Sequence, residues 1–309
     1  MTRVLFAAGD TRWQDYETPL RDAFTGAGLT VDLSTDAAPE MVDYIIYAPD
    51  SAVKDFRPFS RLKAVLNLWA GVEGIVGNDT LTVPLCRMVE DGLTEGMVEW
   101  VTGQVLRHHL GFDRYIKGTT PPWDPVFPPL ARDRSVGILG LGTLGQACAA
   151  SLAGLNFRVS GWSRSAKTQD SVATYHGANG LKTVLSQSEI LVLLLPSTKD
   201  TENTLDARAL ALLPKGAVII NPGRGPLIDD DALLAALNQG QVSHATLDVF
   251  RREPLPTDHP FWPHPRITIT PHVASETRAA SAARAIAENI RRGETGTPYL
   301  HVVDRVSGY

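Results

Sequence analysis

The chain has 309 residues, of which 43% are hydrophobic and 20% charged, and its formal net charge is −5. This balance is typical of a folded globular protein with room for two domains. Without a basic stripe, nucleic acid is not an expected partner. The longest apolar run, residues 190–196, is too short to span a bilayer. The N-terminus lacks a signal-peptide pattern, so we expect a cytoplasmic protein with no membrane partner.

The first third of the chain contains four short apolar runs, and a helix-like segment lies between the first two. Strands are predicted over residues 3–8, 29–34, 44–48 and 64–69, and a helix over 16–27. Such alternation indicates parallel β-α-β units. A long helix is predicted over 92–110 from its apolar periodicity. The Pro-rich stretch KGTTPPWDPVFPPLARD that follows is predicted to be a loop leading into a new unit.

A second alternating series begins at Ser135. Its predicted strands cover residues 135–139, 157–162, 190–195, 217–221, 244–249 and 266–270. Six strands with helices between them are typical of a doubly wound dinucleotide-binding sheet. The last predicted helix, 275–292, has no strand after it and is expected to return to the first domain. We therefore predict a discontinuous substrate domain, residues 1–99 plus 277–309, and a dinucleotide-binding domain, residues 100–276.

The sequence GLGTLG occupies residues 140–145, directly after a predicted strand and directly before a helix-like run. In this position Gly140 permits a tight turn, Gly142 lets a pyrophosphate approach the backbone, and Gly145 allows close helix–strand packing. The helix N-terminus, with Thr143 and Leu144, offers unpaired N–H groups to phosphates.

Ser163, Arg164 and Ser165 directly follow the second predicted strand of this series, at the place where an acidic residue would bind the ribose of NAD. An arginine with two hydroxyls suits a 2′-phosphate instead, because guanidinium makes paired bonds to phosphate oxygens. We expect NADP(H) as the preferred cofactor, with NAD(H) as the open alternative. A solvated loop arginine is the other interpretation of Arg164.

The segments at the carboxyl ends of three later strands each carry one polar candidate: Arg224 in INPGRG, Glu253 in LDVFRREPLP and His272 in TPHVA. Open α/β sheets bind ligands at these carboxyl ends. Reduction of a 2-oxo acid needs a proton donor and a counter-charge for the carboxylate. Histidine is a suitable acid near neutral pH, a neighbouring carboxylate raises its pKa, and arginine binds carboxylates through its planar fork. No histidines and carboxylates have metal-ligand spacing, so no metal site is expected.

The motifs GLGTLG, INPGRG, LDVFRREPLP, HPFW and TPHVA, in this order, resemble those of the D-isomer-specific 2-hydroxyacid dehydrogenases. The segments SRS, MVEWVTGQVLRHH and VDR-x-x-GY are similar to the glyoxylate/hydroxypyruvate reductase A branch of that family. The resemblance implies an α/β fold of two Rossmann-like domains with doubly wound parallel sheets and an interdomain active-site cleft. It also implies NADPH-dependent reduction of glyoxylate or hydroxypyruvate.

The resemblance implies a role for each candidate site residue. Arg224 would bind substrate, Glu253 would orient and charge His272, and His272 would be the proton donor. The first domain would hold the substrate through Trp69 and the backbone amides of Ala70 and Gly71. Further cofactor contacts would come from Leu195, Pro196, Pro222, Gly223, Asp248 and His272. The family implies a homodimer, with Trp123 near the partner's site.

Two alternatives remain open at this point. One is a reductase of a bulkier 2-oxo acid. The other is an NAD(H)-sensing binding protein that keeps the same arginine, glutamate and histidine. Consumption of NADPH with a 2-oxo acid distinguishes an enzyme from a sensor.

Overall fold

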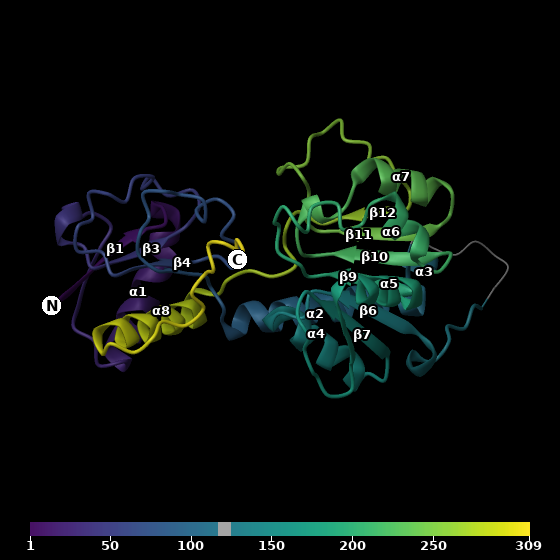
Figure 1. The fold of residues 1–309 in the computed structure, drawn as a ribbon, viewed down its shortest axis with the longest axis horizontal. Helices are drawn as coiled ribbons and strands as arrows, with labels where there is room; N and C mark the ends of the chain where they lie inside the picture. The colour runs from purple at the N-terminus through teal and green to yellow at the C-terminus, as the bar shows by residue number, and fades with distance from the viewer. Residues whose placement is uncertain (117–124) are drawn as a thin grey trace. The chain divides into compact units, whose positions relative to one another are not determined.

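The computed structural model describes residues 1–116 and 125–309, so Trp123 lies outside the described residues. The chain forms two compact units (Figure 1). The first combines Met1–Leu93 with Glu276–Tyr309, and the second is Thr94–Ser275. None of the described helices combines the length and apolar character that crossing a membrane requires.

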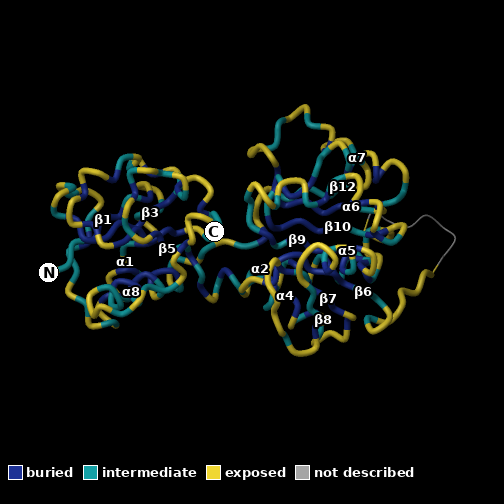
Figure 2. The backbone as a smooth tube through the Cα atoms, in the orientation of Figure 1, coloured by how far each residue is buried: buried dark blue, intermediate teal, exposed yellow. Residues whose placement is uncertain are grey.

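The first unit contains a five-stranded parallel sheet in the order β2-β1-β3-β4-β5. Its strands are β1 (Thr2–Ala7), β2 (Val31–Ser34), β3 (Tyr44–Tyr47), β4 (Ala64–Asn67) and β5 (Leu85–Cys86). Side chains alternate between the two faces of a strand. Val4 and Phe6 of β1 join one core cluster, whereas Leu5 joins the other. Both faces of this sheet are therefore buried, as the strand colours in Figure 2 show.

Two helices from opposite ends of the chain cover one face of this sheet. They are α1 (Asp10–Gly26) and α8 (Ala279–Glu294), which lie side by side below the strands in Figure 1. Leu20 of α1 and Ile286 of α8 are fully or almost fully buried in the same cluster. The C-terminal helix thus belongs to the first unit because its apolar stripe completes that core. The other face is packed by loop residues such as Phe56, Ile75 and Leu81, and η1 (Pro39–Met41) is a short 3-10 helix.

The second unit contains a seven-stranded parallel sheet in the order β12-β11-β10-β9-β6-β7-β8. Its strands are β6 (Ser135–Leu139), β7 (Arg158–Ser163), β8 (Ala173–His176), β9 (Ile190–Leu193), β10 (Ala217–Asn221), β11 (Val242–Leu247) and β12 (Ile267–Ile269). The chain moves outward from β6 to β8 and then returns to β9 on the other side of β6. This reversal is the switch point at which open α/β sheets bind ligands.

Helices cover both faces of the second sheet. On one face α2 (Asp91–Leu110) and α4 (Thr143–Gly154) share a core cluster with β6 and β7. On the other face lie α5 (Gly177–Gln187), α6 (Ala207–Leu212) and α7 (Asp230–Asn238). The remaining pieces are α3 (Asp113–Ile116) and the 3-10 helices η2 (Ala131–Asp133) and η3 (Gly225–Leu227).

The α/β class with two parallel sheets is as predicted, but three elements differ. The second sheet has seven strands rather than six, because β8 forms a half-exposed edge strand with little apolar pattern. Strand β5 was not predicted, because a strand of two residues is too short to show a periodic pattern. Helix α1 begins at Asp10 rather than at residue 16. The prediction started too late because the first turns of this helix are polar apart from Trp13. The Trp13 ring packs against Phe6, with 5.2 Å between the ring centroids.

Candidate active site

The turn between β6 and α4 requires glycine at two places. Gly140 has φ +107°, and a Cβ there would lie 2.5 Å from the Leu194 carbonyl oxygen. A Cβ at Gly145 would overlap the Gly140 carbonyl oxygen. At Gly142, by contrast, a Cβ would meet nothing within 4 Å. The turn is therefore packed tightly at its two ends and open in the middle, where a pyrophosphate would approach.

Helix α4 begins at Thr143, directly behind Gly142. Gly142 is the N-cap residue and has no side chain with which to cap the first turn. The first amides of a helix have no acceptor within the helix and carry partial positive charge. The open surface at Gly142 and these amides fit the diphosphate of a dinucleotide.

The three residues predicted to bind the 2′-phosphate, at and after the end of β7, do not all face solvent. Arg164 and Ser165 are exposed, as a 2′-phosphate contact requires. Ser163 is buried, and its hydroxyl donates to the Ser165 carbonyl at 2.7 Å. The Ser163 hydroxyl therefore shapes the turn that presents Arg164.

The segment after β9 lies against the glycine turn. The Leu194 N–H donates to the Leu139 carbonyl at 2.7 Å, which places Leu195 and Pro196 beside the end of β6. Leu195 is buried, and the Pro196 carbonyl accepts the Thr201 hydroxyl at 2.7 Å. This contact keeps the predicted cofactor-lining dipeptide in a fixed turn.

Arg224 lies in a turn that Asn221 organises. Asn221, the last residue of β10, accepts the Gly223 N–H at 3.1 Å and donates to the Arg224 carbonyl at 2.9 Å. A Cβ at Gly225 would overlap the backbone of Phe250, so this turn packs directly on the segment after β11. Sequence reasoning identified Arg224 but not Asn221, although an asparagine that ends a strand before Pro-Gly is a known turn signal.

Glu253 and His272 form a direct pair within the second unit. Glu253 Oε2 lies 2.7 Å from His272 Nδ1, and Glu253 Oε1 accepts the Phe250 N–H at 2.8 Å. The glutamate is thus fixed by its own loop while it holds the imidazole. Half of the His272 side chain, 51%, is exposed to solvent.

The pair is charged in a way that suits proton donation. The hydrogen bond with Glu253 raises the pKa of His272, against burial and the Arg224 charge, which lower it. Burial alone would raise the pKa of Glu253, but the bonds from His272 and the Phe250 N–H, with the Arg224 charge, hold it below its usual value. Glu253 therefore stays ionised while His272 keeps its proton to higher pH. The three predicted catalytic residues influence one another electrostatically.

Asp248 fixes the turn that carries His272. Its carboxylate is fully buried and accepts the Thr270 hydroxyl (2.5 Å) and the N–H groups of Val273 and Ala274 (2.9 Å each). The His272 N–H donates to the Asp248 carbonyl at 2.8 Å, and His272 has φ +54°. Left-handed backbone is costly for histidine, and these bonds hold it. Contact of Asp248 with a nicotinamide carboxamide stays a prediction.

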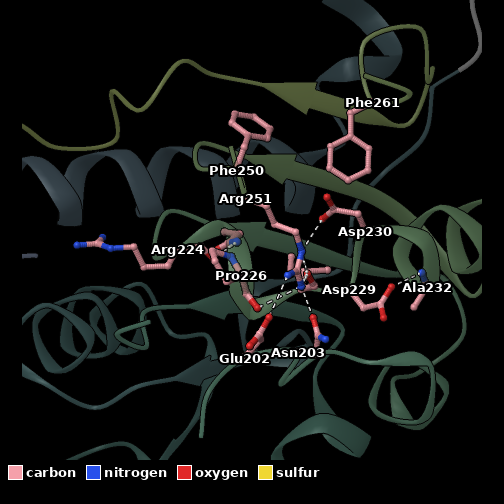
Figure 3. A network of polar contacts seen from close by, with 12 residues as sticks. Glu202, Asn203, Arg224, Pro226, Asp229, Asp230, Ala232, Phe250, Arg251 and Phe261 are labelled. Carbon is pink, nitrogen blue, oxygen red and sulfur yellow. Dashed lines mark hydrogen bonds and ion pairs between the residues drawn. The ribbon is translucent and has the colours of Figure 1, made fainter. Parts of the chain in front are cut away.

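Arg251 links three strand-end loops, as Figure 3 shows. Its guanidinium donates to the Ile228 carbonyl and the Asn203 side chain, and it lies 3.4 Å from Glu202 Oε1. The Arg224 side chain extends away from this network in the same view. Arg251 thus ties the Arg224 turn to the Glu253 loop. Sequence reasoning missed it, because its partners are distant along the chain.

The predicted substrate loop lies in the first unit, after β4. Trp69 is 43% exposed, and the Arg12 guanidinium stands 5.6 Å from the centroid of its indole ring. Asp50 fixes Arg12 through two bonds of 2.8 and 2.9 Å. The N–H groups of residues 69–72 have no acceptor among the residues that the structure describes. A run of free backbone N–H groups is a suitable anion-binding surface.

Comparison with known proteins identifies relatives of both units together. Residues 103–274 match the family model described as D-isomer specific 2-hydroxyacid dehydrogenase, NAD binding domain. The whole chain is similar to a D-isomer specific 2-hydroxyacid dehydrogenase from Xanthobacter autotrophicus Py2, solved with NADPH and MES. The identity is 39%, the TM-score is 0.91, and the match covers 100% of this chain and 99% of that one.

Two further solved structures also match over the whole of this chain. The NADPH-dependent glyoxylate/hydroxypyruvate reductase of Sinorhizobium meliloti, solved with NADP and sulfate, is 35% identical with a TM-score of 0.84, and both chains are covered fully. A probable 2-hydroxyacid dehydrogenase from Rhizobium etli CFN 42, solved with NADP, HEPES and L(+)-tartaric acid, is 32% identical with a TM-score of 0.85. That match covers 100% of this chain and 99% of the other.

Proposed function

The chain belongs to the D-isomer specific 2-hydroxyacid dehydrogenase family and is an oxidoreductase, and from this premise we propose that it reduces a small 2-oxo acid with NADPH. Glyoxylate and hydroxypyruvate are the proposed substrates. The observation that carries the proposal is the 2.7 Å contact between Glu253 and His272 beside Arg224. A relative that is 35% identical is described as an NADPH-dependent glyoxylate/hydroxypyruvate reductase, which supports the substrate class.

NADP(H) is the proposed preferred cofactor, with NAD(H) as the weaker one. The diphosphate would lie on Gly142 and the first amides of α4, Thr143 to Gly145, and the 2′-phosphate would bind Arg164 and Ser165. Leu195, Pro196, Pro222, Gly223 and Asp248 would line the nicotinamide side. When bound, the nicotinamide supplies the hydride. Three relatives solved with NADPH or NADP support the choice of cofactor.

His272 would donate the proton that the substrate carbonyl oxygen needs. Because Nδ1 is held by Glu253, Nε2 is the nitrogen that can face the substrate. The carbonyl carbon gains a hydride and its oxygen gains the His272 proton, so the 2-oxo acid becomes a 2-hydroxy acid. In the reverse direction neutral His272 would take the hydroxyl proton as a general base.

Arg224 would supply the counter-charge for the substrate. Its planar guanidinium can bind the carboxylate and polarise the carbonyl at once. The amides of Ala70 and Gly71 would bind the carboxylate from the substrate loop, and Trp69 would flank it. These assignments are proposals that follow the family pattern.

We also propose that the protein acts as a homodimer in the cytoplasm. The segments 112–116 and 126–130 expose several large apolar side chains, which in a soluble chain indicate an interaction surface. The exposed set is Phe112, Tyr115, Ile116, Val126, Phe127 and Leu130.

Initial-rate assays with a panel of 2-oxo acids and both cofactors test the proposed function. We expect the highest kcat/KM with NADPH and glyoxylate or hydroxypyruvate. A preference for phenylpyruvate would favour the bulkier-substrate alternative. Absence of turnover with every 2-oxo acid, together with intact NADPH binding, would favour a sensor and refute the proposal.

A further inference from the structure

We propose that Asn67 is a positioning residue that shapes the substrate loop, residues 69–72, into an anion-binding surface. The inference rests on the proposed function, in which this loop binds the carboxylate of the 2-oxo acid. Asn67 is the last residue of β4 and is 1% exposed. Its side chain therefore acts on the loop from inside the unit.

The Asn67 side-chain nitrogen binds the loop at two points. Nδ2 donates to the Trp69 carbonyl at 2.8 Å and to the Gly71 carbonyl at 2.9 Å. Two carbonyl groups, two residues apart, thus converge on one nitrogen. The two bonds therefore fix the peptide planes that join Trp69 to Ala70 and Gly71 to Val72.

Because the peptide bond is planar, the two hydrogen bonds to carbonyl groups also set the direction of the N–H groups that follow them. In a trans peptide the carbonyl of one residue and the N–H of the next point in opposite directions. Fixing the Trp69 carbonyl toward Asn67 therefore turns the Ala70 N–H away from it, and the bond to Gly71 does the same for Val72. The Ala70 and Val72 N–H groups are therefore held on the side opposite Asn67, where they can bind an anion together with the Gly71 N–H that lies between them in sequence.

Neighbouring bonds fix the rest of the loop. The Leu68 N–H donates to the Tyr47 carbonyl at 2.8 Å, and the Leu68 carbonyl accepts the Thr277 hydroxyl at 3.0 Å. The Trp69 carbonyl also accepts the Met88 N–H at 3.0 Å. The carbonyls of residues 68, 69 and 71 are thus all occupied, whereas the N–H groups of residues 69–72 have no acceptor within the described ranges.

The two side-chain atoms of Asn67 differ in what they contribute, because only the nitrogen binds the loop. Asn67 Oδ1 is buried and has no donor among the described residues. A buried acceptor without a partner lowers stability, and the two donated bonds offset this cost. An apolar side chain would avoid the unpaired oxygen but could not hold the two carbonyls. Asn67 is therefore suited to orienting the loop rather than to filling space.

The test compares Asn67→Ala with wild type and with Asn289→Ala. Asn289 is a matched control: it is 7% exposed in the same unit and binds the Leu300 backbone through both side-chain atoms, at 2.7 and 3.3 Å. We expect Asn67→Ala to raise the KM for glyoxylate or hydroxypyruvate by about tenfold or more, because bonds to a charged carboxylate become misaligned. The kcat should change far less, and NADPH affinity should be retained.

Binding of oxalate to the NADPH complex provides a readout that needs no turnover. Its affinity should fall by the same factor as KM rises in Asn67→Ala and should be unaffected in Asn289→Ala. If Asn67→Ala does not fold, Asn67→Ser provides the same comparison. Unchanged KM and oxalate affinity, or an equal KM rise in the Asn289 control, would overturn the inference. An inactive wild type would instead refute the proposed function, which separates the two claims.

Discussion

Glu253 determines both the orientation and the charge of His272. Its Oε2 holds Nδ1 at 2.7 Å, and its own position is set by the Phe250 N–H. Glu253 therefore keeps His272 protonated to higher pH, so that more of it can donate a proton in the proposed reduction. This role is separate from that of Asp248, which holds the backbone of the same turn.

Glu253→Gln should move the pH profile of reduction to lower pH. The proposed acid must carry its proton, so kcat/KM falls as the pH rises through the pKa of His272. Removing the carboxylate removes the interaction that raises this pKa. We expect the falling limb to begin at lower pH and the rate at pH 8 to drop by about tenfold or more. A profile that keeps its position would contradict the assignment of Glu253.

Arg164→Ala should weaken NADPH binding and leave NADH binding almost unchanged. Loss of charge-assisted bonds to the 2′-phosphate is expected to raise the NADPH dissociation constant by about 10- to 100-fold. Arg158→Ala is the control, because Arg158 is exposed at the opposite end of β7 and donates to the Asp133 carbonyl. Fluorescence titration with both cofactors measures the effect, and equal losses for both would remove Arg164 from the phosphate site.

At the scale of elements, the β6–α4 turn separates structural from ligand-binding glycines. Gly145 is required by the fold, because any side chain there meets the Gly140 carbonyl oxygen. Gly142 is not required by the fold, since a Cβ would stand in open space. The two glycines of one motif thus predict different phenotypes.

Gly142→Ala should leave the melting temperature nearly unchanged. It should weaken the binding of NADPH by about tenfold or more, because the added methyl group would occupy the space proposed for the diphosphate. Gly145→Ala should instead destabilise the protein by about 1–3 kcal/mol through overpacking. Thermal melts and cofactor titration measure the two effects. A Gly142→Ala protein that binds NADPH normally would argue against this turn as the phosphate site.

Much of the second sheet is predictable from its apolar runs, and the contacts around the site are less so. The patterns SVGIL and AVIIN predict β6 and β10 to the residue, because buried parallel strands are continuous apolar runs. The strand-end placement brings Glu253 and His272 into contact, as the pattern predicts. Asn67 and Arg251 carry no such signal. Arg251 acts on Asn203 from 48 residues away, and only the folded chain brings them together.

At the scale of the whole molecule, the exposed apolar segments around α3 support the proposed homodimer. Ile116 is 71% exposed and Phe127 is 87% exposed, and the Val126 N–H donates to the Tyr115 hydroxyl at 3.1 Å. Several large apolar side chains exposed on neighbouring segments are consistent with association of the chain. We interpret this surface as the contact between two copies of the chain.

The double variant Ile116→Asp/Phe127→Asp should convert a dimer into a monomer, because charged groups are costly to bury in an apolar contact. Val306→Asp is the control, since Val306 is 99% exposed but lies in the C-terminal tail. Light scattering after size-exclusion chromatography should give about half the wild-type mass for the double variant alone. A monomeric wild type, or a double variant that remains dimeric, would contradict this interpretation.

The most direct test of the proposed mechanism is turnover of His272→Ala with NADPH and the preferred 2-oxo acid, measured beside NADPH affinity. His264→Ala is the control, because His264 is a loop histidine whose ring lies 3.4 Å from Asn238. We predict that His272→Ala loses about 10²-fold or more in kcat while it binds NADPH normally, and that His264→Ala matches wild type. Near-normal turnover by His272→Ala would contradict His272 as the proton donor.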